Sequence, residues 1–345
     1  MRVLVIKTSS MGDIIHTLPA LTDAGRALPS IRFDWAVEEN FAEIPRWHSR
    51  VDRVIPLALR RWRKNLFAKT TRTEWKNFLN ELRAEKYDLV IDAQGLLKSA
   101  VVTRFANGTR YGFDKNSARE GLAAMFYNQS FSVERNQHAI HRVRNLFSQS
   151  LGYALPSDTP SYGIDRNRFY DKNNTQDYLV FLHGTTWDTK HWPEKYWIQL
   201  GNIANEKGLL VKLPWGNSIE HERAKRIAEH CPRAEVLPRL DLVKIAGVLA
   251  NAKAIVAVDT GLGHLAAALD VPTVSLYGPT NPVLTGALGE SQIHLTRTLT
   301  CSPCLNRECA LLKSYSSLNP ASPLNPPCFT DLLPTDVWKS LEIFG

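Results

Sequence analysis

Short apolar runs alternate with longer amphipathic stretches along the whole chain. In the first half, the runs at 3–6, 33–37, 51–56 and 89–91 have the length and β-branched content of buried parallel strands. Helical spacing is clearest over 73–85. This alternation predicts βαβ units that build a parallel sheet.

A polar, proline-containing stretch at 157–175 predicts a linker, after which the alternation starts again. Further strands are predicted at 178–182, 209–213, 254–258 and 273–277, and a closing helix at 335–344. We therefore expect an α/β protein with two successive doubly wound sheets and a cleft between them. The predicted domains are 1–165 and 166–330, followed by the closing helix in 331–345.

A chain of 345 residues exceeds what one hydrophobic core usually supports, which agrees with two domains. Its 44% hydrophobic and 22% charged residues are typical of globular proteins. No apolar run of about 18 residues occurs, and Lys7 interrupts the first apolar stretch. Neither a membrane span nor a secretory signal is predicted, so we expect a cytoplasmic protein.

Lys and Arg number 42 against 34 Asp and Glu, a net charge of +8 that favours contact with phosphates or an anionic surface. Residues 60–72 contain six of these cations and two aromatic residues. Such a segment could bind a phosphorylated lipid, lie on anionic headgroups or contact nucleic acid. A solvated basic helix face is an equal alternative.

The first predicted strand ends in a turn of small and polar residues, namely Thr8, Ser9, Ser10 and Gly12. Asp13 follows at the carboxyl end of the strand, the usual ligand position in an open parallel sheet. It could accept a proton there, with Lys7 holding it ionised, or it could simply favour a helix N-terminus. Asp92 and Gln94 follow the strand at 89–91, where they could face the crevice or form the turn.

A second candidate site follows the predicted strand at 254–258. The segment Gly261-Leu-Gly-His-Leu-Ala266 fits the dinucleotide fingerprint, but this is not the first turn of its domain and the next strand does not end in an acidic residue. What remains is a small-residue turn that opens a helix, whose N–H groups suit a diphosphate. Thr260 and His264 could add donors, and Asp259 could order the turn. A helix start without a ligand is the alternative.

The chain has neither a P-loop nor an Asp-x-Asp triplet. A nucleotide-sugar enzyme of this sequence would therefore hold its diphosphate with helix ends, hydroxyls and cations, without a metal. Thr185, Thr186 and Lys190 offer those groups. Glu222 could accept hydrogen bonds from a ribose or could lie on a solvated helix face.

Five cysteines in a chain without a predicted export signal argue against a disulfide framework. Four of them lie late in the chain, namely Cys301, Cys304, Cys309 and Cys328. Their spacing permits a zinc site but lacks a second tight pair, so reduced thiols without a metal are expected. His138 and His141 are expected on a polar helix face.

Six segments, in order along the chain, resemble the lipopolysaccharide heptosyltransferases. They are Lys7-Thr-Ser-Ser-Met-Gly-Asp13, Arg60-Arg-Trp-Arg-Lys64, Ile91-Asp-Ala-Gln-Gly95, Lys190-His-Trp-Pro193, Leu213-Pro-Trp-Gly216 and Val258-Asp-Thr-Gly261. The likeness covers residues 1 to about 295. It implies a GT-B fold of two Rossmann-like domains. It also implies metal-independent, inverting transfer of L-glycero-D-manno-heptose from ADP-heptose to Kdo of Kdo2-lipid A, the first heptose of the inner core, with no cofactor.

The same resemblance implies residue roles. Asp13 matches the general base that deprotonates the acceptor hydroxyl as it attacks the anomeric carbon opposite ADP. The implied donor-binding residues are Thr185, Thr186, Lys190, Glu222, Asp259, Thr260, Gly261 and His264. The implied acceptor-binding residues are Ser10, Arg60, Arg61, Arg63 and Lys64.

The N-terminal domain would then bind the acceptor and the C-terminal domain ADP-heptose, and domain closure would bring Asp13 to the sugar and exclude water. The expected partners are donor, acceptor and the anionic inner-membrane surface at its cytoplasmic face, with no nucleic acid.

The cysteine-bearing segment from about 300 to 330 departs from this pattern and is similar to Cys-x-Pro-Cys segments of other heptosyltransferases. It leaves open an alternative in which the chain adds the second or a later core heptose. A nucleotide- or polyanion-binding module without catalysis is a further alternative, although it would not require Asp13 or the residues at 185–190.

Overall fold

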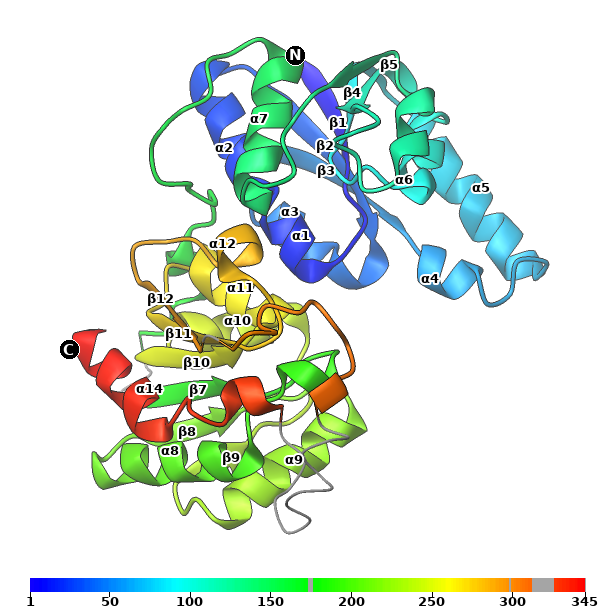
Figure 1. The fold of residues 1–345 in the computed structure, drawn as a ribbon. Coiled ribbons are helices and arrows are strands. Elements are labelled where there is room, and N and C mark those ends of the chain that lie inside the picture. The colour runs from blue at the N-terminus through cyan, green and yellow to red at the C-terminus, as the bar shows by residue number, and fades with distance from the viewer. Residues whose placement is uncertain (173–175, 298, 312–325, 345) are drawn as a thin grey trace. The chain divides into compact units, whose positions relative to one another are not determined.

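The computed structural model describes residues 1–344 except 173–175, 298 and 312–325 (Figure 1). The chain forms two compact units, Met1–Asp165 and Arg166–Gly345. Within the described residues each unit contains one six-stranded sheet whose paired strands are all parallel. The end of the predicted linker, at 173–175, lies outside the described residues.

In the first unit the strand order is β3-β2-β1-β4-β5-β6. The strands are β1 (Arg2–Ile6), β2 (Arg32–Glu38), β3 (Val51–Leu57), β4 (Lys86–Asp92), β5 (Asn107–Phe113) and β6 (Gln129–Phe131). The helices are α1 (Met11–Ile15), α2 (Leu18–Ala27), α3 (Glu43–Arg46), α4 (Leu59–Trp62), α5 (Lys69–Arg83), α6 (Leu97–Thr103) and α7 (Ala139–Leu151), with 3₁₀-helices η1 (Glu39–Phe41) and η2 (Gly121–Phe126). The order reverses between β1 and β4, so their carboxyl ends form the ligand position typical of such a sheet.

The second unit repeats this arrangement with the order β12-β11-β10-β7-β8-β9. The strands are β7 (Tyr178–Leu182), β8 (Leu210–Leu213), β9 (Ala234–Val236), β10 (Ala254–Val258), β11 (Thr273–Tyr277) and β12 (Gln292–Thr296). The helices are α8 (Glu194–Glu206), α9 (Ser218–Glu229), α10 (Leu242–Ala250), α11 (Gly261–Ala268), α12 (Pro282–Thr285) and α14 (Pro334–Leu341), with 3₁₀-helices η3 (Arg166–Phe169), η4 (Asp188–Lys190), η5 (Pro327–Phe329) and η6 (Glu342–Phe344). Here the order reverses between β7 and β10.

All eight strands predicted from apolar runs occur in the structure. Central strands such as β1, β7 and β10 are buried along nearly their whole length, because helices cover both faces of a parallel sheet. The pattern misses β5, β6, β9 and β12. Of these, β6, β9 and β12 are sheet edges, which are short or polar and leave no continuous apolar run.

The helix predicted at the C-terminus is α14, which packs against α8 and β11 of the second unit. It buries Val337 and Leu341 there. Two hydrogen bonds fix the chain before it: Trp192 Nε1 donates to the Leu332 carbonyl at 2.9 Å, and the Tyr196 hydroxyl donates to the Thr330 carbonyl at 2.8 Å. The C-terminal segment is therefore part of the second core.

Candidate active site

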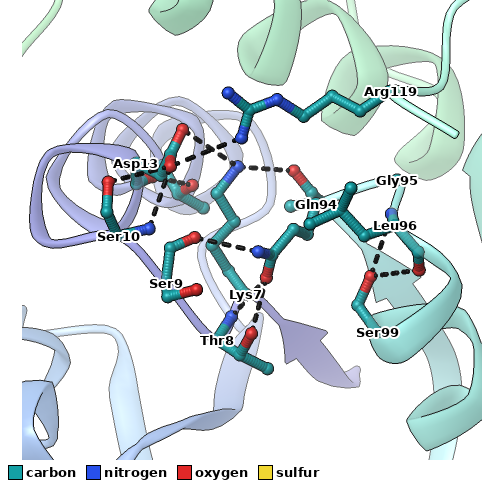
Figure 2. A network of polar contacts seen from close by, with 12 residues as sticks. Lys7, Thr8, Ser9, Ser10, Asp13, Gln94, Gly95, Leu96, Ser99 and Arg119 are labelled. Atoms are coloured by element: carbon teal, nitrogen blue, oxygen red, sulfur yellow. Dashed lines mark hydrogen bonds and ion pairs between the residues drawn. The ribbon is translucent and has the colours of Figure 1, made fainter. Parts of the chain in front are cut away.

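Asp13 lies in the first turn of α1, directly after β1 (Figure 2). Its Oδ2 accepts hydrogen bonds from the Ser10 backbone N–H at 2.9 Å and the Ser10 hydroxyl at 3.0 Å. Arg119 Nη1 lies 3.6 Å from Oδ2, and Lys7 Nζ lies 4.0 Å from Oδ1. The side chain keeps 24% of its surface exposed. Asp13 therefore caps the helix start and still presents a partly exposed carboxylate.

The charges around Asp13 keep it ionised. Burial alone would raise the pKa of its carboxyl, but Lys7, Arg119 and the two Ser10 hydrogen bonds outweigh burial and bring the pKa below its usual value. Lys7 is buried, and its Nζ also donates to the Ala93 carbonyl at 2.8 Å. A carboxylate that stays ionised at neutral pH can accept a proton from a bound hydroxyl.

Asp92 and Gln94 are both buried, Asp92 at the end of β4 and Gln94 in the turn that follows it. Gln94 Oε1 accepts from the backbone N–H and the hydroxyl of Thr8, both at 2.8 Å, and Gln94 Nε2 donates to the Ser9 carbonyl at 3.0 Å. Asp92 Oδ1 accepts from the backbone N–H of Gln94 and Gly95. The structure thus selects the turn-forming alternative for both residues. Together they fix the turn that carries Asp13.

The basic segment at 60–72 contains one cation that is paired with carboxylates and others that are exposed. Arg61 is held between two carboxylates, with Nη2 3.0 Å from Glu39 Oε2 and Nη1 2.8 Å from Glu74 Oε2. Arg60, Arg63 and Lys64 are exposed, and the Arg60 guanidinium lies over the Phe41 ring. Arg61 therefore stabilises the segment, and its charge is already paired.

Lys98 adds a further cation beside the turn after β1. Its Nζ donates to the Ser9 hydroxyl at 3.1 Å. Burial lowers the pKa of Lys98, and the positive charges of Arg60 and Arg63 lower it further. The carboxylate of Asp13 acts on the same ammonium group in the opposite direction.

In the second unit, four predicted donor residues meet where β7 and β10 end. Lys190 Nζ forms an ion pair with Asp259 Oδ2 at 2.6 Å, and His264 Nε2 lies 3.9 Å from Oδ1. The Thr185 hydroxyl donates to the Asp259 carbonyl at 3.0 Å. Thr280, which the sequence did not indicate, donates its hydroxyl to Asp259 Oδ2 at 2.8 Å. This cluster lies at the switch point of the second sheet.

The helix α11 begins at this cluster. Thr260 is its N-cap residue in an extended conformation, and Gly261 is its first residue. The first N–H groups of a helix receive no carbonyl from within it, and the helix dipole adds partial positive charge. Together with Lys190, this helix start can hold the two negative groups of a diphosphate.

Two residues predicted to bind ADP-heptose, Thr186 and Glu222, are exposed rather than part of the Asp259 cluster. Glu222 lies on α9 with 59% of its side chain exposed and accepts from Lys225 Nζ at 2.9 Å, which fits the solvated helix face. The side chain of Glu220, on the same helix, lies against Gly184 in the turn after β7. It lies so close that a Cβ atom at Gly184 would collide with the Glu220 carboxylate. Glu220 was not predicted.

Three basic side chains, of which only His183 is fully buried, lie together at the loop 183–193. Arg223 contacts the ring of His191 and donates to the His183 carbonyl at 3.3 Å. Burial and the Arg223 charge lower the pKa of His183 to about 3 and that of His191 to about 4. Both imidazoles are therefore neutral at neutral pH, and the guanidinium carries the charge.

The cysteine-bearing loop is hydrogen-bonded to η4 and to the turn after β11 in the second unit. The Thr189 hydroxyl donates to the Asn306 carbonyl at 2.8 Å, and the Leu305 N–H donates to the Pro279 carbonyl at 2.8 Å. Arg307 and Lys190 both lie over the Trp187 ring. All five cysteines are free, and no three metal-ligating side chains of the described residues are arranged around a common point.

His138 differs from its prediction. It is buried rather than on a polar helix face, and it is the N-cap of α7, where its Nδ1 accepts from the Ile140 N–H at 3.1 Å. Its ring also packs edge-on against His16, with centroids 5.7 Å apart.

The two α/β units share one strand order, and together with the match to E. coli heptosyltransferase WaaC this assigns the chain to the glycosyltransferases of the GT-B fold. Residues 75–315 match the model of glycosyltransferase family 9 (heptosyltransferase), and the chain belongs to this family.

The chain is similar to named members of the family. It is 56% identical to lipopolysaccharide heptosyltransferase 1 of Pseudomonas aeruginosa over 345 residues, which cover 99% of this chain and 97% of that protein. It is 53% identical to lipopolysaccharide heptosyltransferase 1 of Escherichia coli over 295 residues, 85% of this chain and 92% of that protein. Its structure superposes on E. coli heptosyltransferase WaaC with ADP at a TM-score of 0.88 and 46% identity over the full length of both chains.

Proposed function

We propose that this protein transfers L-glycero-D-manno-heptose from ADP-heptose to Kdo of Kdo2-lipid A and so adds the first heptose of the lipopolysaccharide inner core. The observation that carries the proposal is the ionised, partly exposed carboxylate of Asp13 at the switch point of the first sheet. Support comes from the relatives named lipopolysaccharide heptosyltransferase 1 and from the similar structure that contains ADP.

In the proposed reaction, Asp13 accepts the proton of a Kdo hydroxyl while the hydroxyl oxygen forms a bond to the anomeric carbon of heptose. The bond from that carbon to the diphosphate oxygen breaks at the same time, and ADP leaves from the opposite face. The low pKa of Asp13 makes it a weak base, so proton transfer accompanies bond formation to the anomeric carbon rather than preceding it. Ser10 holds Asp13 in place for this step.

The departing ADP gains negative charge, and the second unit supplies the matching positive groups. Asp259 fixes the Lys190 ammonium beside the start of α11, with Thr185 and Thr260 as neighbouring hydroxyls. Fixed dipoles and a fixed cation stabilise the developing charge without reorganisation during the reaction. Gly261 and His264 complete the proposed diphosphate site, and Thr186 and Glu222 remain proposed contacts at its exposed margin.

The acceptor carries carboxylates and phosphates, and we assign their binding to the cations of the first unit. Arg60, Arg63 and Lys64 serve as the proposed contacts, with Lys98 nearer to the turn. Arg61 acts indirectly by holding the segment between Glu39 and Glu74. In this proposal the protein works on the cytoplasmic face of the inner membrane. No helix of the described residues is long and apolar enough to cross a bilayer.

The reaction is tested by supplying substrates singly and together. ADP should form only when ADP-heptose and Kdo2-lipid A are both present, and mass spectrometry should show one added heptose. An acceptor that already carries one heptose should not react. Transfer to that acceptor alone would instead assign the chain to the next step of core assembly, and no transfer to either acceptor would refute the proposal.

Arg119 should set the acidic limb of the pH dependence. Replacing it by glutamine removes one of the positive charges that lower the pKa of Asp13, so the carboxylate becomes protonated at higher pH. The acidic limb of kcat/KM against pH should therefore move to higher pH in Arg119→Gln and return toward its original position in Arg119→Lys. An unchanged limb in Arg119→Gln would separate Arg119 from the ionisation of Asp13.

A further inference from the structure

The connection between α4 and α5 presents two apolar side chains to solvent. Leu66 is 60% exposed and Phe67 is 85% exposed. Both lie in the basic segment, between Lys64 and Lys69 in the sequence. The proposed heptose transfer assigns no task to this apolar pair. We call residues 63–69 the α4–α5 loop.

The base of the α4–α5 loop is rigid. Trp62 is 5% exposed and packs edge-on against Trp75, with ring centroids 5.6 Å apart, and it also packs against Phe78. Glu74 accepts hydrogen bonds from both Trp62 Nε1 and Arg61. Phe67 stays 85% exposed outside this aromatic cluster.

The charged residues next to Leu66 and Phe67 in the sequence are all positive. Because Arg61 is paired with Glu39 and Glu74, the exposed side chains nearest to these two residues in sequence include four cations, namely Arg63, Lys64, Lys69 and Arg72. Residues 60–73 contain no Asp or Glu. The first unit as a whole carries 24 Lys and Arg against 17 Asp and Glu, so seven of the eight net positive charges lie in it.

We propose that the α4–α5 loop docks on an anionic phospholipid bilayer, with Leu66 and Phe67 inserted at the headgroup boundary and Arg63, Lys64, Lys69 and Arg72 on the lipid phosphates. An exposed apolar pair with cations before and after it in the sequence is the pattern that binds such an interface, since apolar burial and attraction to anionic lipid act together. The proposal deepens the proposed function, because it adds a membrane contact that is independent of the acceptor lipid.

The observations favour a bilayer over the other anionic or apolar partners. Two exposed apolar side chains provide far less area than a stable interface between two copies of the chain, which buries about 800 Å² on each partner. Single-stranded nucleic acid is bound by several aromatic side chains on which successive bases stack, whereas the loop exposes one. A bilayer needs neither a large complementary surface nor a row of stacking platforms.

Co-sedimentation with vesicles tests the proposal directly. The full-length protein should bind vesicles of phosphatidylethanolamine and phosphatidylglycerol that contain no lipid A, and should not bind vesicles of phosphatidylcholine. The double variant Leu66→Ser/Phe67→Ser should bind the anionic vesicles about 10- to 100-fold more weakly, because two apolar side chains no longer leave water. The matched control is Val283→Ser/Ile343→Ser, which removes two apolar residues of 74% and 73% exposure from the second unit and should bind like the original protein.

Activity on a water-soluble, de-acylated Kdo acceptor separates this proposal from the proposed function. Leu66→Ser/Phe67→Ser should keep its kcat/KM on the soluble acceptor and lose activity on acceptor embedded in vesicles. Equal vesicle binding by the double variant and the control would overturn the membrane proposal while heptose transfer stood. Absence of transfer to the soluble acceptor, with vesicle binding intact, would overturn only the function. A change of oligomeric state in the double variant, with unchanged vesicle binding, would assign the pair to contact between copies.

Discussion

Replacing Asp13 by asparagine is expected to lower kcat for heptose transfer about 10²- to 10⁴-fold, the usual contribution of a general base, and to leave the affinity for ADP-heptose unchanged. The amide oxygen of asparagine can still accept the hydrogen bonds of Ser10, so α1 keeps its start while the proton acceptor is lost. The effect belongs on kcat because the base acts in the transition state. Steady-state kinetics and calorimetric titration with ADP provide the two readouts.

Two further variants give this experiment its controls. Asp13→Ala should lose as much activity as Asp13→Asn and in addition unfold more easily, by about 1 kcal/mol, because the helix start loses a cap. Asp52→Asn changes an exposed carboxylate of the same unit, paired with Arg32, and should retain full activity. Turnover of Asp13→Asn at the original rate would remove Asp13 from the mechanism.

Replacing Lys190 by methionine is expected to weaken ADP binding about 10- to 100-fold and to lower kcat as well. A hydrogen-bonded charge contributes about 1.5 to 3 kcal/mol, and here the charge also faces the leaving group as it gains negative charge. Methionine retains an unbranched apolar side chain, so the change mainly removes the charge, which includes the contact of the Lys190 ammonium with the Trp187 ring. Calorimetry with ADP and steady-state kinetics with ADP-heptose measure the two effects.

Lys190 is paired with Asp259, so its loss leaves a carboxylate that is only 10% exposed. Part of the effect of Lys190→Met is therefore on stability, which thermal unfolding measures separately. The double variant Lys190→Met/Asp259→Asn removes the uncompensated charge and should recover stability without recovering ADP affinity. Lys244→Met, which changes an exposed cation on α10, should bind ADP normally. Full ADP affinity in the double variant would exclude Lys190 from the diphosphate site.

The strands that the sequence predicts are those that carry an apolar run, and most of them lie inside a sheet, where burial on both faces favours apolar residues. β5 lies inside its sheet but was missed, since its sequence, Asn-Gly-Thr-Arg-Tyr-Gly-Phe, has no such run. Gly112 shows why: a Cβ there would collide with the ring of Tyr127, whose hydroxyl donates to Asp92 at 2.8 Å. The absence of a side chain at Gly112 leaves room for the Tyr127 ring, whose hydroxyl binds the buried Asp92 carboxylate.

The sequence predicted the candidate-site residues that are neighbours along the chain. It missed residues that come from other segments and meet them only in the fold. Lys7, Ser10 and Asp13 lie within one turn, so their grouping follows from the strand that precedes them. Arg119 reaches Asp13 from a segment more than one hundred residues later, and nothing in its own neighbourhood indicates this. Thr280, 21 residues after Asp259 and beyond the end of the neighbouring strand β11, was also missed. Long-range pairing depends on the order of the strands, which apolar patterning alone leaves undetermined.

Gln94 has a consequence for attempts to exchange segments between related transferases. Its amide accepts from Thr8 and donates to Ser9, so the loop after β1 obtains its shape from a side chain in the turn after β4. A hybrid that imports residues 7–13 without the matching 92–95 would leave buried polar groups without partners, each at a cost of about 1 to 3 kcal/mol. These two stretches form a single module for recombination, although more than seventy residues separate them in the chain.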